Sequence, residues 1–144
     1  MRTLEKIHYL DTVAVLRLFD SKAYTHILKP CYYLSKTGDG WVYVLTAFLS
    51  VLIAGYENLY FWSLLLAFSI ERPLYYILKN SLKRNRPFKI INIKNLIVPS
   101  DQFSFPSGHT SAAFLFCIIT LYFIPGLLFL LLPWSILIAC SRIV

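Results

Sequence analysis

The sequence has few charged residues, and two long stretches have almost none. Only 15% of its 144 residues are charged, against roughly 25% in a typical soluble domain. Residues 41–70 carry Glu57 alone, and residues 110–141 carry no Asp, Glu, Lys or Arg. A soluble core of this size could not bury so much apolar surface. We therefore predict an integral membrane protein that forms one domain over residues 1–144.

Cysteine is also scarce and scattered. Cys31, Cys117 and Cys140 form no Cys-x-x-Cys pair and have no nearby histidine to complete a metal site, so we interpret them as packing residues. The net charge of +7 could suggest nucleic acid, but a chain with long apolar stretches has little surface for such a partner. We expect no nucleic-acid binding, and we expect the basic side chains to face lipid headgroups or phosphate.

The first part of the chain, residues 1–40, predicts an amphipathic segment at the membrane surface. Apolar side chains recur there at spacings of three and four among charged ones, as in a helix that lies on a membrane rather than crossing it. Two glycines, Gly38 and Gly40, then indicate a turn. Asp39 between them is expected to be a turn former rather than an acid.

The apolar stretches predict an all-α bundle of about four transmembrane helices over residues 41–144. Residues 41–56 and 59–79 have the lengths of two helices and form a hairpin. Aromatic side chains near the ends of these two helices are expected at the membrane–water interface. They are Trp41, Tyr43, Tyr56, Tyr60 and Trp62.

The last apolar stretch is too long for one crossing. Its 32 residues would make a helix about 48 Å long, whereas the hydrocarbon core is about 30 Å thick. Pro125-Gly126 divides the stretch, so we predict two helices over residues 107–124 and 126–143. A polar loop, residues 86–102, precedes them.

This topology brings four separated residues to one membrane face. Two crossings return the chain to its starting side, and two more return it again. Lys79, Arg86, His109 and Arg142 are therefore expected on the same face. Basic residues there would favour the cytoplasmic side, but residues recruited for phosphate inflate that count, so the side is left unassigned.

Two short motifs predict a phosphate site on this face. Lys79 and Arg86 supply fixed positive charge. Pro-Ser-Gly-His at residues 106–109 offers backbone N–H groups, a hydroxyl and an imidazole at a helix start. Pro106 is expected in the first turn of that helix, and Gly108 is expected to let the backbone approach an anion.

Each motif has a simpler interpretation when it stands alone. A basic helix end often reaches toward anionic headgroups, and Pro-Ser-Gly-His could be no more than a capped helix start. Together on one face they favour phosphate binding, with His109 placed to give a proton to a leaving oxygen. His8 and His26 lack such neighbours and are not expected to take part.

These motifs resemble those of the type 2 phosphatidic acid phosphatase and vanadium haloperoxidase superfamily, in its small bacterial membrane form. The first signature, a lysine, six residues and Arg-Pro, matches Lys79, Arg86 and Pro87. The second, Pro-Ser-Gly-His, matches residues 106–109. The third is Ser-Arg, five residues, a histidine and, three residues later, an aspartate. It begins at Ser141-Arg142, and the printed sequence ends at Val144.

The resemblance implies a phosphatase that acts on a lipid phosphate through a phosphohistidine, without a metal or cofactor. Phosphatidate-like lipids and polyprenyl diphosphates are the implied substrates, and the bacterial inner membrane is the implied location. His109 would be the general acid. The implied phosphate-binding residues are Lys79, Arg86, Ser107, Gly108 and Arg142.

The nucleophile of the resembled family would lie outside the printed sequence. That nucleophile is the histidine of the third signature, which would fall beyond Val144. We therefore expect the 144-residue chain, read as truncated within this signature, to bind phosphate weakly and to turn over little. Oligomeric state is not assigned.

Two other classes of function remain open. A non-enzymatic phospholipid-binding protein would keep the anion-binding residues without a nucleophile. A small transporter or channel subunit would account for Glu71-Arg72-Pro73, since ionisable residues within a membrane helix often mark a transport pathway. The simpler interpretation of this triplet is that Pro73 bends the helix and the charges pair within the bundle.

Overall fold

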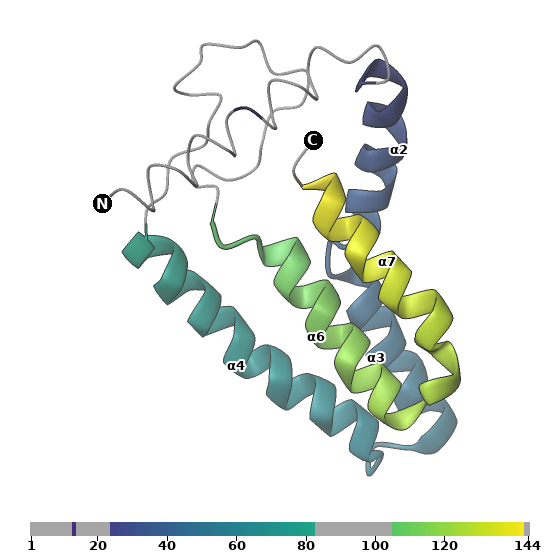
Figure 1. Ribbon diagram of the computed structural model, residues 1–144. Coiled ribbons are helices and arrows are strands. Elements are labelled where there is room, and N and C mark those ends of the chain that lie inside the picture. Colours follow the sequence, from purple (N-terminus) through teal and green to yellow (C-terminus); the bar gives the residue numbers. More distant parts are fainter. Residues whose placement is uncertain (1–12, 14–23, 83–104, 143–144) are drawn as a thin grey trace.

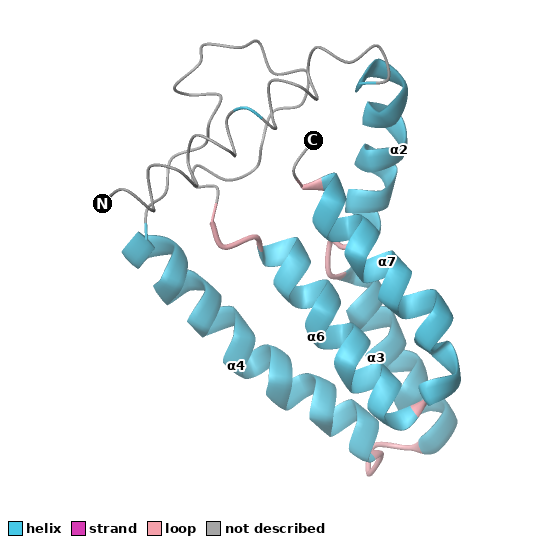
Figure 2. Ribbon diagram, viewed as in Figure 1, coloured by secondary structure: helices cyan, strands magenta, loops and turns pink. Residues whose placement is uncertain are grey.

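The computed structural model describes residues 13, 24–82 and 105–142, and every element in the last two ranges is helical (Figure 1). Nearly all of the described residues are in helices, which are joined by short loops (Figure 2). The prediction of an all-helical protein is confirmed for these residues. The helices are α2 (Tyr24–Thr37), α3 (Trp41–Ala54), α4 (Leu59–Leu82), α6 (Gly108–Phe123), the 3-10 turn η1 (Pro125–Leu127) and α7 (Leu128–Ser141).

The predicted hairpin is observed as α3 and α4. Gly55 ends α3 with a φ of 77°, a left-handed conformation that favours glycine. Asn58 then starts α4, because its side-chain oxygen accepts a hydrogen bond from the Tyr60 backbone N–H at 3.0 Å. α4 continues through Pro73 and Lys79 to Leu82.

The last apolar stretch is divided where the sequence predicts. α6 ends at Phe123, and Pro125 opens η1, which leads directly into α7. Two helices of 16 and 14 residues therefore replace one long helix. The stretch Lys29–Ala54 is long and apolar enough to cross a membrane, and the apolar helices Gly108–Phe123 and Pro125–Ser141 are shorter.

Some predictions fall on residues outside the described ranges. They concern the polar loop 86–102, Arg86 and most of the amphipathic segment before Tyr24. Of that segment the structure describes α2, a helix with Pro30 inside it that packs against α7.

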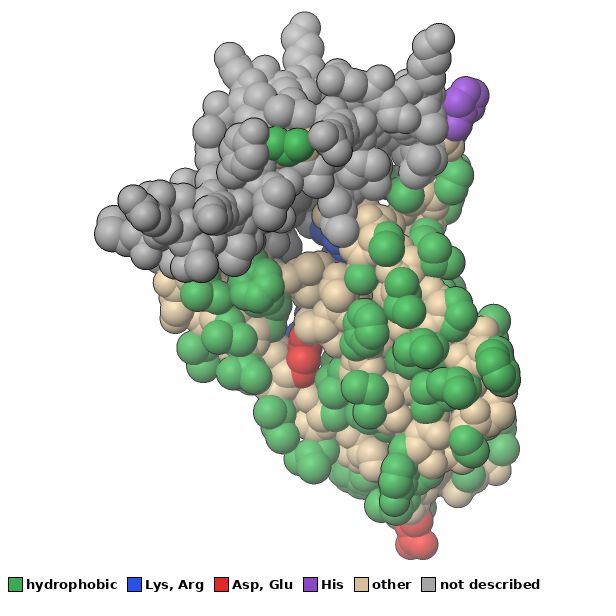
Figure 3. All heavy atoms as spheres, viewed as in Figure 1, with side chains coloured by type: hydrophobic (Ala, Val, Ile, Leu, Met, Phe, Trp, Pro, Cys, Tyr) green, Lys and Arg blue, Asp and Glu red, His purple; other side chains and the backbone are tan. Residues whose placement is uncertain are grey.

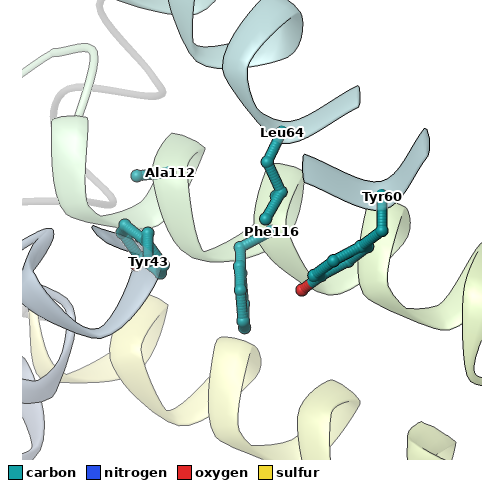
Figure 4. Close-up of a cluster of buried hydrophobic side chains, with 5 residues drawn as sticks. All are labelled: Tyr43, Tyr60, Leu64, Ala112 and Phe116. Carbon is teal, nitrogen blue, oxygen red and sulfur yellow. The ribbon is translucent and has the colours of Figure 1, made fainter. Parts of the chain in front are cut away.

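α6 lies between α4 and α7 and forms the centre of the bundle (Figure 1). Its buried Ala112 and Ala113 are small, which lets the neighbouring helices approach closely. Side chains from α3, α4 and α6 meet in the core cluster (Figure 4). The cluster consists of Tyr43, Tyr60, Leu64, Ala112 and Phe116.

Two aromatic residues expected at the membrane interface are instead in the core. Tyr43 and Tyr60 are only 5% and 7% exposed, so the interfacial prediction is wrong for them. Tyr43 stacks on Phe68, with ring centroids 5.2 Å apart. The Tyr60 hydroxyl shares a 2.9 Å hydrogen bond with Thr120 Oγ1, which satisfies both buried groups.

The outside of the described helices is mostly apolar. Hydrophobic side chains cover the visible faces of α4, α6 and α7 (Figure 3). Ile53, Tyr122 and Phe129 are each more than 80% exposed. Two of the cysteines differ in their environment. Cys117 is buried in the core, as predicted for a packing residue. Cys140 is exposed, so the packing interpretation is wrong for it.

Candidate active site

The second predicted motif forms the start of α6. Ser107 is the N-cap, and its Oγ accepts a hydrogen bond from the Thr110 backbone N–H at 3.4 Å. The helix begins at Gly108, one residue after the cap. Pro106 therefore precedes the cap, and its predicted place in the first helical turn is wrong.

Gly108 is in close contact with an aromatic ring of α4. A Cβ on Gly108 would lie 3.1 Å from both Cε2 and Cζ of Tyr75, which is too close for an ordinary contact. The absence of a side chain thus lets α6 pack directly on the Tyr75 ring. This packing gives a reason for the glycine that differs from the predicted approach of an anion.

The same tyrosine connects the start of α6 to Lys79. Lys79 is 9% exposed, and its ammonium group donates a hydrogen bond to the Tyr75 hydroxyl. The Lys79 Nζ also lies 4.8 Å from the centroid of the Tyr75 ring. The described part of the first motif and the second motif therefore meet through Lys79, Tyr75 and Gly108.

His109 is paired with a residue of the turn between α2 and α3. Its Nε2 lies 2.6 Å from Asp39 Oδ1. The side chains of His109 and Asp39 are 23% and 44% exposed, so both groups are partly open to solvent. Asp39 holds the place in the turn that the sequence predicts, but its contact with His109 was not predicted.

The charged triplet of α4 is paired inside the bundle. Glu71 Oε2 lies 2.5 Å from Arg72 Nε, and Glu71 Oε1 accepts a 2.6 Å hydrogen bond from the Ser111 hydroxyl. Arg72 Nη2 donates to the Gly108 carbonyl oxygen at 3.3 Å. The predicted internal pairing is confirmed, and it ties α4 to the first turn of α6.

Arg142 lies at the same end of the bundle but has a different partner. It caps the C-terminus of α7, and that end of α7 points toward the same end of the bundle as the start of α6 (Figure 1). Its Nη1 donates a 2.9 Å hydrogen bond to Ser35 Oγ on α2. Lys79, His109 and Arg142 thus lie toward one end of the bundle, and the predicted shared membrane face stays a prediction.

A cavity of about 540 Å³ opens beside this cluster, with α3 and α4 supplying most of its walls. Asp39, Arg72, Tyr75 and His109 line its polar end. The remaining wall is almost entirely apolar and follows α4 down to Phe61, about 16 Å from Arg72 at 1.5 Å per residue. The apolar lining includes Tyr43, Val44, Ala47, Phe61, Leu64, Leu65 and Phe68.

One polar atom lies in the apolar part of this wall. The Tyr43 hydroxyl is buried and has no hydrogen-bond partner among the residues that the structure describes. A buried hydroxyl ordinarily has one. Within the same residues, no three side chains of His, Cys, Asp or Glu converge as metal ligands would.

Sequence reasoning missed three residues at the polar end, namely Asp39, Arg72 and Tyr75. Two of them carried a signal in their spacing. Tyr75 and Arg72 precede Lys79 by four and seven residues, which are one and two helical turns, so all three share a face of α4. Asp39 had no such signal, because 70 residues separate it from His109.

Comparison with known proteins agrees with the motifs. A search of curated proteins and a search of solved structures each return no match. The sequence description of the PAP2 superfamily matches residues 40–144, which is most of the chain. This range begins one residue after Asp39 and includes α3 to α7 and both complete signature motifs. The chain therefore belongs to the PAP2 superfamily, and this membership supports a phosphatase type of function.

Proposed function

We propose that the protein is a membrane-embedded lipid phosphatase whose site lies at the polar end of the cavity along α3 and α4. One observation carries this proposal. Gly108 and His109 at the start of α6 line the polar end of an apolar cavity of about 540 Å³. The buried Lys79 is connected to that end by its hydrogen bond to Tyr75, which also lines the cavity. A phosphate at this end would have a hydrocarbon chain extending along the cavity.

A membrane location accounts for the outer surface of the helices. Large apolar side chains point outward on α3, α4, α6 and α7, and exposed apolar area of this extent needs a cover. Lipid provides that cover. We propose four crossings, made by α3, α4, α6 and α7, in a bacterial inner membrane, with the amphipathic segment 1–40 at its surface.

The proposed reaction is phosphoryl transfer to a histidine and then to water. The family nucleophile would form a P–N bond as the P–O bond to the lipid breaks. His109 would give a proton to the leaving oxygen, and water would then hydrolyse the phosphohistidine. The residues proposed to hold the phosphoryl oxygens are Lys79, Arg86, Ser107, Gly108 and Arg142.

Substrates with a long hydrocarbon chain fit this site best. The cavity wall is apolar over about 16 Å of α4, which suits the chain of a phosphatidate-like lipid or a polyprenyl diphosphate.

Phosphate release from lipid vesicles tests the proposal. We expect the protein encoded by the natural reading frame to release phosphate from phosphatidate or from a polyprenyl diphosphate. If the folded full-length protein releases no phosphate from these lipids or from soluble esters, the phosphatase proposal is wrong. Retained binding to phosphatidate vesicles would then favour the non-enzymatic alternative.

A large side chain in the cavity should lower the hydrolysis of long-chain substrates but not that of soluble ones. Ala47 lines the cavity on α3, and Ala47→Trp would occupy space that a hydrocarbon chain needs. We expect phosphatidate hydrolysis to fall by about tenfold or more, since each 1.4 kcal/mol of lost binding is a factor of ten, whereas hydrolysis of p-nitrophenyl phosphate should change little.

Ala54→Trp is the matched control. Ala54 is exposed at the end of the same helix and does not line the cavity. The control should hydrolyse both substrates like the wild type. Equal losses on both substrates in Ala47→Trp would argue against a chain-binding cavity.

A further inference from the structure

The turn between α2 and α3 holds an acidic side chain against the predicted general acid. Asp39 Oδ1 and His109 Nε2 are 2.6 Å apart, a short distance typical of a charge-assisted hydrogen bond. The two residues are 70 positions apart in the sequence, so this contact is a product of the tertiary fold. The proposed reaction leaves Asp39 without a role.

The backbone around Asp39 is fixed on both sides. The Gly38 and Asp39 N–H groups donate to the Ser35 and Lys36 carbonyl oxygens at 3.0 and 3.3 Å. Gly40 has a φ of 89°, which favours glycine. A Cβ on Gly38 would lie 3.2 Å from the Ser35 carbonyl oxygen. Both glycines thus serve a tight turn that presents the carboxylate at one place.

The position of the carboxylate distinguishes two possible roles for His109. A phosphate oxygen bound at Nε2 would lie beside the Asp39 carboxylate and would be repelled by it. A proton donor, in contrast, gains from this neighbour, because a hydrogen-bonded carboxylate fixes the orientation and tautomer of the ring. The other charged or titratable groups that line the cavity are Arg72, Tyr75 and Tyr76 on α4 and Tyr43 on α3.

We propose that Asp39 is a positioning residue for His109 in the proposed phosphatase reaction, on which this inference rests. The Nε2–H group donates to Asp39 Oδ1, so the transferable proton of the imidazolium is on Nδ1. As the P–O bond breaks, its electron pair stays with the leaving oxygen, which takes the Nδ1 proton. The ring is left neutral, with its remaining proton on Nε2 and still bonded to Asp39.

A spectroscopic experiment tests the pairing without relying on activity. The full-length protein, labelled with ¹⁵N-histidine in lipid nanodiscs, should show a His109 Nε2–H resonance at low field, identified by its loss in His109→Asn. Asp39→Ala should shift this resonance upfield. Glu57→Ala, which alters an exposed acid in the α3–α4 connection, should leave it unchanged. A His109 signal that is the same in Asp39→Ala as in the wild type would overturn the pairing.

A kinetic experiment tests the role. Asp39→Ala should lower kcat for phosphatidate by roughly 10²-fold, with little change in KM. The loss should be much smaller for p-nitrophenyl phosphate, because its leaving group departs without a proton. Asp39→Glu should restore part of the activity. In a His109→Asn background, Asp39→Ala should cause no further loss.

These outcomes separate the inference from the function on which it depends. Equal losses on both substrates, or additive losses in the double variant, would show a merely structural role for Asp39 and overturn the inference. A full-length wild type without phosphatase activity would overturn the proposed function and the proton-transfer role with it. In an active enzyme, an unchanged His109 spectrum would overturn the Asp39 pairing alone.

Discussion

Replacement of His109 by asparagine is expected to lower kcat for lipid phosphate hydrolysis by roughly 10²- to 10⁴-fold. Asparagine has a similar size and remains polar at the start of α6, but it cannot give a proton to the leaving oxygen. The loss should therefore appear mainly in kcat, with KM nearly unchanged. The measurement is steady-state phosphate release by the full-length protein from phosphatidate vesicles.

His26→Asn provides the matched control for this variant. His26 is exposed on α2 and does not line the cavity, so its replacement should leave kcat at the wild-type value. The pair shows whether a loss is specific to the site, since both variants exchange the same side chains. A His109→Asn protein with normal kcat on phosphatidate would refute the role of His109 as general acid.

The helices could be predicted because their signals are local in the sequence. The apolar stretches have helical lengths, and the polar pair Glu57-Asn58 and the pair Pro125-Gly126 separate them in the sequence. In the structure, Gly55 and Pro125 follow the ends of α3 and α6. These residues act through their own backbone conformations. The predicted boundaries of these helices therefore lie within a few residues of the observed ones.

The rotation of each helix about its axis could not be predicted in the same way. An aromatic residue near a helix end suits both an interface and a core, so Tyr43 and Tyr60 were assigned to the wrong environment. In a lipid-facing bundle both faces of a helix are apolar, and hydrophobic periodicity cannot tell them apart. The cavity beside α3 and α4 depends on these rotations and was not predictable either.

The site was predictable as a set of residue types but not as a set of contacts. The motifs identified Lys79, Gly108 and His109, and the structure brings these residues to one end of the bundle. Tyr75, which joins Lys79 to Gly108, lies in no signature motif. Only the packing of α4 on α6 shows why this ring and this glycine occur together.

The turn that presents Asp39 depends on one buried side chain of α7. Ile138 is fully buried, and its Cδ1 lies 3.4 Å from the position that a Cβ on Gly38 would take. Ile138→Ala would leave a cavity under this turn. We expect the free energy of unfolding to fall by about 2–3 kcal/mol, at the lower end for such replacements, because in lipid the loss is mostly of packing.

The change should also reach the site, because the same side chain supports Gly38. In Ile138→Ala we expect a weaker His109–Asp39 hydrogen bond, seen as an upfield shift of the His109 Nε2–H resonance. Unfolding by SDS, followed through tryptophan fluorescence, measures the stability. Ile136→Ala removes the same atoms from a position on α7 that is 46% exposed, and it should cost less than about 1 kcal/mol. An equal decrease in the free energy of unfolding in the two variants would mean that Ile138 does not anchor the turn on α7.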